Sequence, residues 1–222
     1  MNLFYRVVNK FRKSIFNKKY RSKVVERYRN RLTNTDFSII CNNCFGGILY
    51  HDLGVKFLSP TINMYIKAND YIEFLENLDY YLTCDLVDGG PLDSSEGGGV
   101  LALLDGKIGL YGIHYNSFEE MSKKWYERRD RLNKDNLFII GSYRDGCNDD
   151  LVERFCALPY KNKVFISHKP FPYDCVVTID GYSKEAPSAD AMFSRKMRAY
   201  DNAFDFVAWL NNGGDRTYED RQ

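Results

Sequence analysis

Residues 37–47 read FSIICNNCFGG, a short apolar run that passes through a polar turn into two glycines. The apolar run over 37–41 favours a β-strand, the asparagines after it favour a loop, and residues 48–53 continue as a helical segment. This order of strand, loop and helix is typical of α/β domains, in which ligands bind outside the carboxyl ends of the strands. The segment therefore predicts both the class of fold and one side of a binding site.

The rest of the chain repeats this alternation. Further strands are expected at residues 136–141, 163–167 and 175–179, and helices at 68–82, 117–133, 148–158 and 188–210. The expected N-caps of three of these helices are Asn69, Ser117 and Asn148. Asp105-Gly106 marks a hairpin between residues 100–104 and 107–112, and the glycine-rich residues 86–99 are expected to form an exposed loop. Strands that alternate with helices predict a single α/β domain over 36–222, with a parallel or mixed central sheet between helical layers.

Charge is distributed unevenly along the chain. Residues 1–35 carry eleven Lys or Arg and one acid, Glu26, whereas the remaining residues carry twenty bases and twenty-nine acids. The apolar side chains between Leu3 and Phe16 fall at helical spacing, and cations occupy much of the remaining turn. The pattern predicts a basic amphipathic N-terminal segment on an anionic membrane surface, where each cation contributes roughly 1 kcal/mol. A helix packed on its own acidic domain is an equally supported alternative. Nucleic acid is not an expected partner, because no recognition motif adjoins the segment.

The composition indicates a cytoplasmic protein. Its 222 residues, 44% of them hydrophobic, suffice for one globular domain with an appendage. No run of 18 apolar residues is present, and charges interrupt the N-terminus where a signal peptide needs an apolar stretch. The six cysteines are scattered, which suits reduced thiols rather than a disulfide framework. The expected location is therefore the cytoplasm, peripheral at the inner leaflet of the membrane.

Polar and titratable residues gather at the expected strand ends and turns. These residues are Asn42, Asn43, Cys44, Ser59, Thr61, His114, Tyr115, Arg144, Asp145, His168 and Lys169. A single crevice would bring together a base, small hydroxyls, carboxamides and cations. The candidate bases are His114, His168 and Asp145, and the alternative for each histidine is a hydrogen bond to a loop carbonyl.

The turn before the first helix is a candidate anion site. Asn43 and the amides of Gly46 and Gly47 are suited to a phosphate group at the start of a helix. The same position would lower the pKa of Cys44 and make it a nucleophile, although a packed thiol is the favoured alternative. Cys41 and Cys44 lack the second ligand pair that zinc needs, so no metal is expected.

One predicted helix carries Trp125 and Arg128 on the same face. Arginine suits phosphate groups and tryptophan suits the face of a sugar or a base. The favoured alternative is a solvated basic face with Trp125 in the core.

Four segments carry a resemblance to a known family: residues 37–47 with Ser59-Pro60-Thr61 after them, 114–120, 124–129 and 155–163. Together they resemble an uncharacterised bacterial family associated with exopolysaccharide biosynthesis, the family of domain of unknown function nineteen-nineteen. The resemblance covers roughly residues 37–210 and leaves the first 35 residues outside. It implies a three-layer α/β/α sandwich and a place in capsule or surface-glycan synthesis, and it carries no catalytic residues. The family usually has Ser at the position of Cys41, which weakens a redox interpretation of that cysteine pair.

The expected function is a cytoplasmic, membrane-associated glycosyltransferase that uses a nucleotide-sugar donor and a lipid-linked acceptor. In this hypothesis Asn43 and the Gly46–Gly47 amides hold the diphosphate, and Arg128 and Arg144 balance its charge. One alternative is a Cys44-dependent acyltransferase or hydrolase that acts on a glycan. The other is a non-catalytic glycan-assembly or binding protein.

Overall fold

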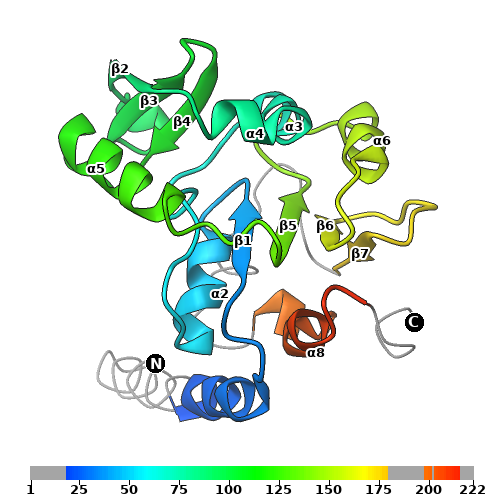
Figure 1. Ribbon diagram of the computed structural model, residues 1–222. Coiled ribbons are helices and arrows are strands. Elements are labelled where there is room, and N and C mark those ends of the chain that lie inside the picture. Colours follow the sequence, from blue (N-terminus) through cyan, green and yellow to red (C-terminus); the bar gives the residue numbers. More distant parts are fainter. Residues whose placement is uncertain (1–18, 180–197, 202, 216–222) are drawn as a thin grey trace, which may run out of the picture.

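The central sheet of the protein is parallel. Figure 1 shows the computed structural model, which describes residues 19–179, 198–201 and 203–215. Within these residues the sheet has four strands in the order β1 (Ser38–Cys41), β5 (Leu137–Ser142), β6 (Lys163–Ser167) and β7 (Val176–Thr178). Every neighbouring pair is parallel, with Ile40 opposite Ile139 and Ile140 opposite Val164. The predicted α/β class with a parallel sheet is confirmed.

Helices cover both faces of this sheet (Figure 1). The helices on one face are α2 (Phe45–Leu53), α8 (Phe206–Asn211) and a helix over residues 19–31. On that face Phe138 of β5 packs edge-on against Trp209 of α8, with ring centroids 4.8 Å apart. The other face is covered by α3 (Ala68–Glu76) and α6 (Asp149–Ala157). There Phe155 of α6 packs on Phe165 of β6, with centroids 5.0 Å apart, and a three-layer arrangement results.

A smaller antiparallel sheet lies in the long connection between β1 and β5. Its strands are β2 (Leu86–Pro91), β3 (Val100–Leu104) and β4 (Ile108–Gly112), which lie between α4 (Leu78–Tyr81) and α5 (Phe118–Arg129). The predicted hairpin is confirmed, since Asp105 and Gly106 take φ values of 51° and 66°. The predicted loop over residues 86–99 is wrong at its first half, because the edge strand β2 pairs with β3 through its backbone around a bulge near Asp88.

Local capping signals predicted helix starts better than helix ends. Ser117 accepts from Glu120 N at 3.2 Å, and Asn148 accepts from Leu151 N at 2.9 Å, so both predicted N-caps are confirmed. Asn69 is not a cap, because the helix begins one residue earlier, after Lys67. The expected helix over 68–82 is interrupted at Asn77, and the expected helix over 117–133 ends at Arg129. Of the expected helix over 188–210, residues 188–197 lie outside the described residues, and α8 is the part that forms near its end.

The described part of the basic N-terminal segment packs on the domain. Residues 1–18 of the segment lie outside the described residues. In the helix over 19–31, Val24 and Tyr28 are buried members of the hydrophobic core, and Arg21 is only 8% exposed. The alternative of a helix packed on its own domain therefore holds for this part. Among the described residues no helix combines the length and the apolar character that crossing a bilayer requires.

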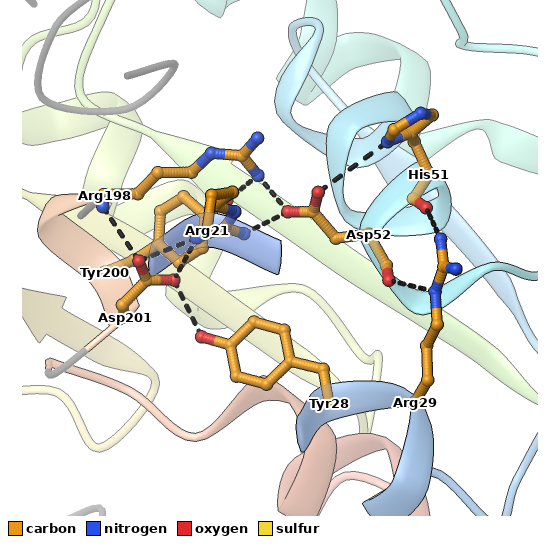
Figure 2. Close-up of polar contacts among 8 residues, drawn as sticks. All are labelled: Arg21, Tyr28, Arg29, His51, Asp52, Arg198, Tyr200 and Asp201. Atoms are coloured by element: carbon orange, nitrogen blue, oxygen red, sulfur yellow. Dashed lines mark hydrogen bonds and ion pairs between the residues drawn. The ribbon is translucent and has the colours of Figure 1, made fainter. Parts of the chain in front are cut away.

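An ion-pair cluster joins this helix to α2 and to the chain before α8 (Figure 2). We define the cluster as Arg21, Asp52, Arg198 and Asp201. Arg21 donates to both carboxylate oxygens of Asp201, at 2.9 and 2.8 Å, and also contacts Asp52. Arg198 contacts Asp52 as well, and Tyr28 donates its hydroxyl to Asp201 at 2.7 Å. Two cations and two carboxylates thus balance one another inside the protein.

Candidate functional site

The ends of β1 and β5 form a topological switch point. The chain leaves β1 into α2 on one face of the sheet and leaves β5 into α6 on the other face. Ligands of open α/β sheets bind where two such connections diverge. We call the residues that follow these two strands the switch-point site: Asn42, Asn43, Cys44, Ser142, Arg144 and Asp145. The structure thus brings together the residues predicted after these two strands.

A carboxamide and hydroxyl network holds the two strand ends together. Asn43 Nδ2 donates to Ser142 Oγ at 2.8 Å, and Ser142 Oγ donates to Asn42 Oδ1 at 3.0 Å. Asn43 Oδ1 also accepts from Phe45 N at 2.9 Å. The three polar side chains are at most 4% exposed. Asn42 and Asn43 therefore position the loops of the site, and their polar atoms are engaged within the protein rather than offered to a ligand.

Asp145 differs from the other members of the site. Its backbone is left-handed, with φ 54°, as at Asp105, and it lies in a turn that is closed by Cys147 N, which donates to the Arg144 carbonyl at 3.0 Å. Its carboxylate is 22% exposed, with Arg144 Nε 3.9 Å from Oδ2, yet the buried Oδ2 accepts no hydrogen bond from the described residues. Burial raises the pKa of Asp145, and the charge of Arg144 opposes that rise only in part. A partly buried carboxylate with a raised pKa and an oxygen that accepts no hydrogen bond from the described residues is the strongest catalytic candidate at the switch-point site.

Cys44 lies beside Asp145 at the N-cap position of α2. Burial raises the pKa of its thiol to about 11, although the nearby charge of Arg144 acts in the opposite direction. Its sulfur lies 3.9 Å from the carbonyl oxygen of Met64. This raised pKa does not support the activation of Cys44 as a nucleophile and agrees with the favoured alternative of a packed thiol, because burial outweighs the positive end of the helix.

The glycines at the start of α2 serve helix packing. A Cβ atom on Gly46 would lie 2.9 Å from Cys41 Cβ, and one on Gly47 would lie 3.3 Å from Ile62. Cys41 is buried, and burial raises the pKa of its thiol to about 12 against the backbone amides of Asn43 and Gly46. The first turn of α2 thus faces protein groups, which does not support the predicted diphosphate contact at Gly46 and Gly47.

The two candidate histidines lie in different parts of the fold. His168 follows β6, and its ring packs edge-on against Tyr143 with centroids 4.6 Å apart. Its buried Nδ1 has no hydrogen-bond partner among the described residues. Lys169, next in the chain, pairs with Asp149 at 2.6 Å. His114 is exposed and follows β4, so the topology places it on the smaller sheet rather than at an end of the parallel sheet.

Two predicted binding hydroxyls support the edge of β1 instead. Ser59 and Thr61 are at most 1% exposed. Thr61 Oγ1 accepts from Cys41 N at 3.2 Å and lies 3.2 Å from Ser59 Oγ. Because β1 is an edge strand, its outer amides need such partners. The structure therefore does not bring Ser59 or Thr61 to a ligand surface.

Three further predicted binding residues belong to the scaffold. Trp125 is fully buried, as the alternative interpretation of its helix expected. Arg128 is 8% exposed and donates to Tyr115 Oη at 2.8 Å, and Tyr115 donates in turn to the carbonyl oxygen of Ile62 at 2.8 Å. These contacts fasten α5 to the segment after α2, and a ligand does not reach them without displacing core contacts.

Sequence reasoning missed a segment that lies against the switch-point site. Ile66 N donates to the Asn42 carbonyl and Ala68 N to the Asp145 carbonyl, both at 2.9 Å. Tyr65 stacks on Tyr111 with centroids 4.5 Å apart, next to the site. Residues 62–67 alternate buried and more exposed side chains, and this period of two was the available signal.

A second site of another kind lies at the opposite end of the sheet. A pocket of about 580 Å³ opens between the break after α3 and the start of β6, and its lining includes Asp79, Lys134 and Asn162. Lys134 and Asp79 pair with each other at 2.6 Å. The described residues hold no group of three or more His, Cys, Asp or Glu side chains suited to a metal ion. The switch-point site therefore remains the stronger candidate.

Comparison with known proteins identifies relatives over nearly the whole chain. Residues 15–211 match a family described as a domain of unknown function, DUF1919. An uncharacterized protein of Haemophilus influenzae is 35% identical over 215 residues, which cover 96% of this chain and 100% of the relative. The family match begins at residue 15, so it includes the helix over 19–31, which the sequence resemblance had left outside.

Proposed function

The chain belongs to the DUF1919 family, and we propose that it is a glycosyltransferase of surface-polysaccharide synthesis with its reaction at the switch-point site. The donor is a nucleotide sugar and the acceptor is a lipid-linked glycan. Asp145 is the general base in this proposal, and Arg144 is the cation that faces the diphosphate of the donor. The observation that carries the proposal is the Asp145 carboxylate, with its raised pKa and its buried Oδ2 that accepts no hydrogen bond from the described residues.

A carboxylate in this state is suited to proton transfer. The Asp145 side chain is 22% exposed, so a hydroxyl of the acceptor can approach the open part of its carboxylate, and a raised pKa makes the carboxylate a better proton acceptor. Asp145 takes the hydroxyl proton while the hydroxyl oxygen forms a bond to the anomeric carbon of the donor sugar. The bond between that carbon and the diphosphate oxygen breaks, and the nucleoside diphosphate leaves with the electron pair. The Arg144 guanidinium stabilises the charge that develops on the leaving group.

The thiol alternative has weaker support. An acyltransferase or hydrolase would use Cys44 as a thiolate, whereas its pKa of about 11 keeps the thiol protonated. A non-catalytic binding protein has no need of a partly buried carboxylate with a raised pKa. The state of the Asp145 carboxylate therefore favours a catalytic role over both alternatives.

The membrane part of the proposal rests on charge. Lys23 and Arg27 of the helix over 19–31 are exposed, and residues 1–19 contain six further cations. Basic residues of this kind attract an anionic surface, at roughly 1 kcal/mol for each cation near it. The proposal thus puts the protein on the cytoplasmic leaflet, where a lipid-linked acceptor would lie.

Donor binding is tested first by a thermal shift. Purified protein is screened against nucleoside diphosphates and nucleotide sugars, each at about a hundred times its dissociation constant, where binding stabilises by roughly 2.7 kcal/mol. For a chain of this length that corresponds to a rise in Tm of about 5 to 11 °C. No rise with any donor would contradict the proposal.

Catalysis is tested with the preferred donor and a lipid extract. Asp145→Asn should retain donor binding and lower sugar transfer by roughly 10²- to 10⁴-fold, the usual contribution of a general base. Arg144→Lys should weaken donor binding, because lysine lacks the planar fork that matches a diphosphate. The matched control is Asp36→Asn, the same change at an exposed position before β1. Equal turnover in Asp145→Asn and the control would exclude Asp145 as the base.

Membrane association needs its own test in the full chain. Charge reversal of Lys10, Arg12 and Lys13 should abolish flotation with anionic liposomes, because the attraction becomes a repulsion. The matched control reverses three exposed cations elsewhere: Lys107, Lys123 and Lys161. Deletion of residues 1–35 is unsuitable, since it removes Val24 and Tyr28 from the core. If charge reversal of Lys10, Arg12 and Lys13 leaves flotation with anionic liposomes unchanged, the proposed membrane association is refuted.

A further inference from the structure

Two cysteines from different elements meet on the α6 side of the sheet. Cys156 lies in α6 and Cys175 comes directly before β7. Their sulfur atoms are 3.0 Å apart, and the thiol of Cys175 donates to the sulfur of Cys156. Both residues are partly buried, and neither is in a disulfide, so a small solute reaches their sulfur atoms. The other four cysteines make no sulfur-to-sulfur contact among the described residues.

We propose that Cys156 and Cys175 form a reversible disulfide when the protein meets hydrogen peroxide. One thiolate attacks a peroxide oxygen, the O–O bond breaks, and the products are a sulfenic acid and hydroxide, which a proton converts to water. The second sulfur then attacks the sulfenic sulfur, the S–O bond breaks and a second water leaves. Two thiols lose two protons and two electrons in total, and one peroxide molecule becomes two waters.

The surroundings of the pair affect how readily Cys156 ionises. The hydrogen bond with Cys175 and burial both raise the pKa of the Cys156 thiol. Either thiolate can attack the peroxide, because the other sulfur is in contact and resolves the sulfenic acid. Lys163 at the start of β6 places a positive charge near the pair and opposes the rise at Cys156.

A bond at this point would brace one side of the switch-point site. Cys156 and Cys175 are 19 positions apart, and the chain between them contains β6 and the loop with His168 and Lys169. The Cys175 carbonyl already accepts from Phe165 N at 2.8 Å, which holds this end of the loop to β6. Oxidation would add a covalent tie to α6, and we infer that it restricts motion of the loop over 168–174.

The test counts thiols in the full chain. The protein is reduced, freed of reductant, treated with hydrogen peroxide, unfolded and alkylated, and its intact mass is measured. The reduced protein should take up six alkyl groups and the oxidised protein four, with a peptide pair that links Cys156 to Cys175. Dithiothreitol should restore six. Hydrogen exchange of the amides over 168–174 should be slower in the oxidised form.

Variants identify the reacting pair. Neither Cys156→Ser nor Cys175→Ser should give a disulfide-linked peptide after peroxide treatment, because each variant lacks one sulfur of the pair, and each should take up five groups once dithiothreitol has reduced any sulfenic acid. The matched control Cys84→Ser should fall from five to three, because it leaves the pair intact. Six alkylated thiols in the oxidised wild type, or a linked peptide that contains another cysteine, would overturn the proposal. An oxidised protein with stable sulfenic acid on Cys175 and no link would overturn it as well.

Discussion

Removal of the Asp52 carboxylate should destabilise the protein strongly. The side chains of the ion-pair cluster are almost inaccessible, with exposed fractions of 3% for Asp52, 2% for Asp201 and 10% for each arginine. In Asp52→Ala, the Arg21 guanidinium keeps its contact with Asp201, whereas the Arg198 guanidinium loses its contact with Asp52 (Figure 2). The ion-pair cluster then holds two buried cations and one carboxylate.

The size of the effect follows from this imbalance. Breaking a buried ion pair by removal of one partner costs about 3 to 5 kcal/mol. A chain of 150 to 250 residues loses roughly 2 to 4 °C in Tm for each kcal/mol, so Asp52→Ala should lower Tm by about 6 to 20 °C. Circular dichroism during heating measures Tm, and urea titration gives the free energy of unfolding. The control Asp36→Ala changes an exposed carboxylate and should stay within about 0.5 kcal/mol of the wild type.

A double variant separates charge balance from lost packing. Asp52→Ala combined with Arg198→Met leaves Arg21 paired with Asp201, one cation with one carboxylate. The two changes should therefore couple favourably, with an interaction energy of about 0.5 to 3 kcal/mol in a double-mutant cycle. A loss below about 1 kcal/mol for Asp52→Ala, or additive effects in the cycle, would refute the reasoning from buried charge.

Three further predictions follow from the site and its scaffold. Gly46→Ala should lower the free energy of unfolding by about 1 to 3 kcal/mol in urea, because the new methyl group would lie 2.9 Å from Cys41 Cβ; an unchanged midpoint would contradict the close packing of α2 on β1. Asp145→Asn should raise the stability at neutral pH by about 0.5 to 2 kcal/mol, since it removes a desolvated charge and asparagine accepts a left-handed backbone. Because burial raises the folded-state pKa of Asp145, the folded state binds more protons, and the wild type should lose stability as pH rises from the ordinary aspartate pKa through the folded value. The difference in stability between the wild type and Asp145→Asn should vanish at pH values below the ordinary aspartate pKa. A difference that does not change with pH would argue against desolvation of the carboxylate. Cys44, with its pKa of about 11, should react with iodoacetamide at pH 7 about a hundredfold more slowly than a thiol at the ordinary value of 9.0, and mass spectrometry of the labelled peptide measures this rate.

The parallel sheet could be predicted because its strands are recognisable in isolation. Buried parallel strands are continuous apolar runs, and the short apolar runs at β1, β5 and β6 match this pattern of buried strands. Strand β2 could not be recognised in this way. It is an edge strand with two glycines and an exposed Val87, and it pairs through backbone groups that its composition does not reveal.

The candidate site could be predicted only where topology implies position. Arg144 and Asp145 follow a strand, so their position at a strand end could be predicted, whereas their meeting with the end of β1 depends on the strand order, which the sequence does not reveal. The role of Arg128 and Trp125 depends on which helix face is buried, and the same residue types serve a core and a binding surface equally well. The ion-pair cluster was beyond prediction, since Arg21 meets a partner 180 positions away.

That separation has a consequence during protein synthesis. A ribosome adds about 5 to 20 residues per second, so roughly 9 to 36 seconds pass between the appearance of Arg21 and that of Asp201. Strand β1 likewise forms no pairing with β5, its neighbour in the sheet, until about 100 further residues have been made, because Ser38 pairs with Leu137. A nascent chain thus exposes the apolar β1 until residues 137–142 have been made, and the cationic helix until residue 201 has been made. Chaperones that hold such intermediates should therefore bind this protein on the ribosome, and chains truncated before residue 198 should remain their clients.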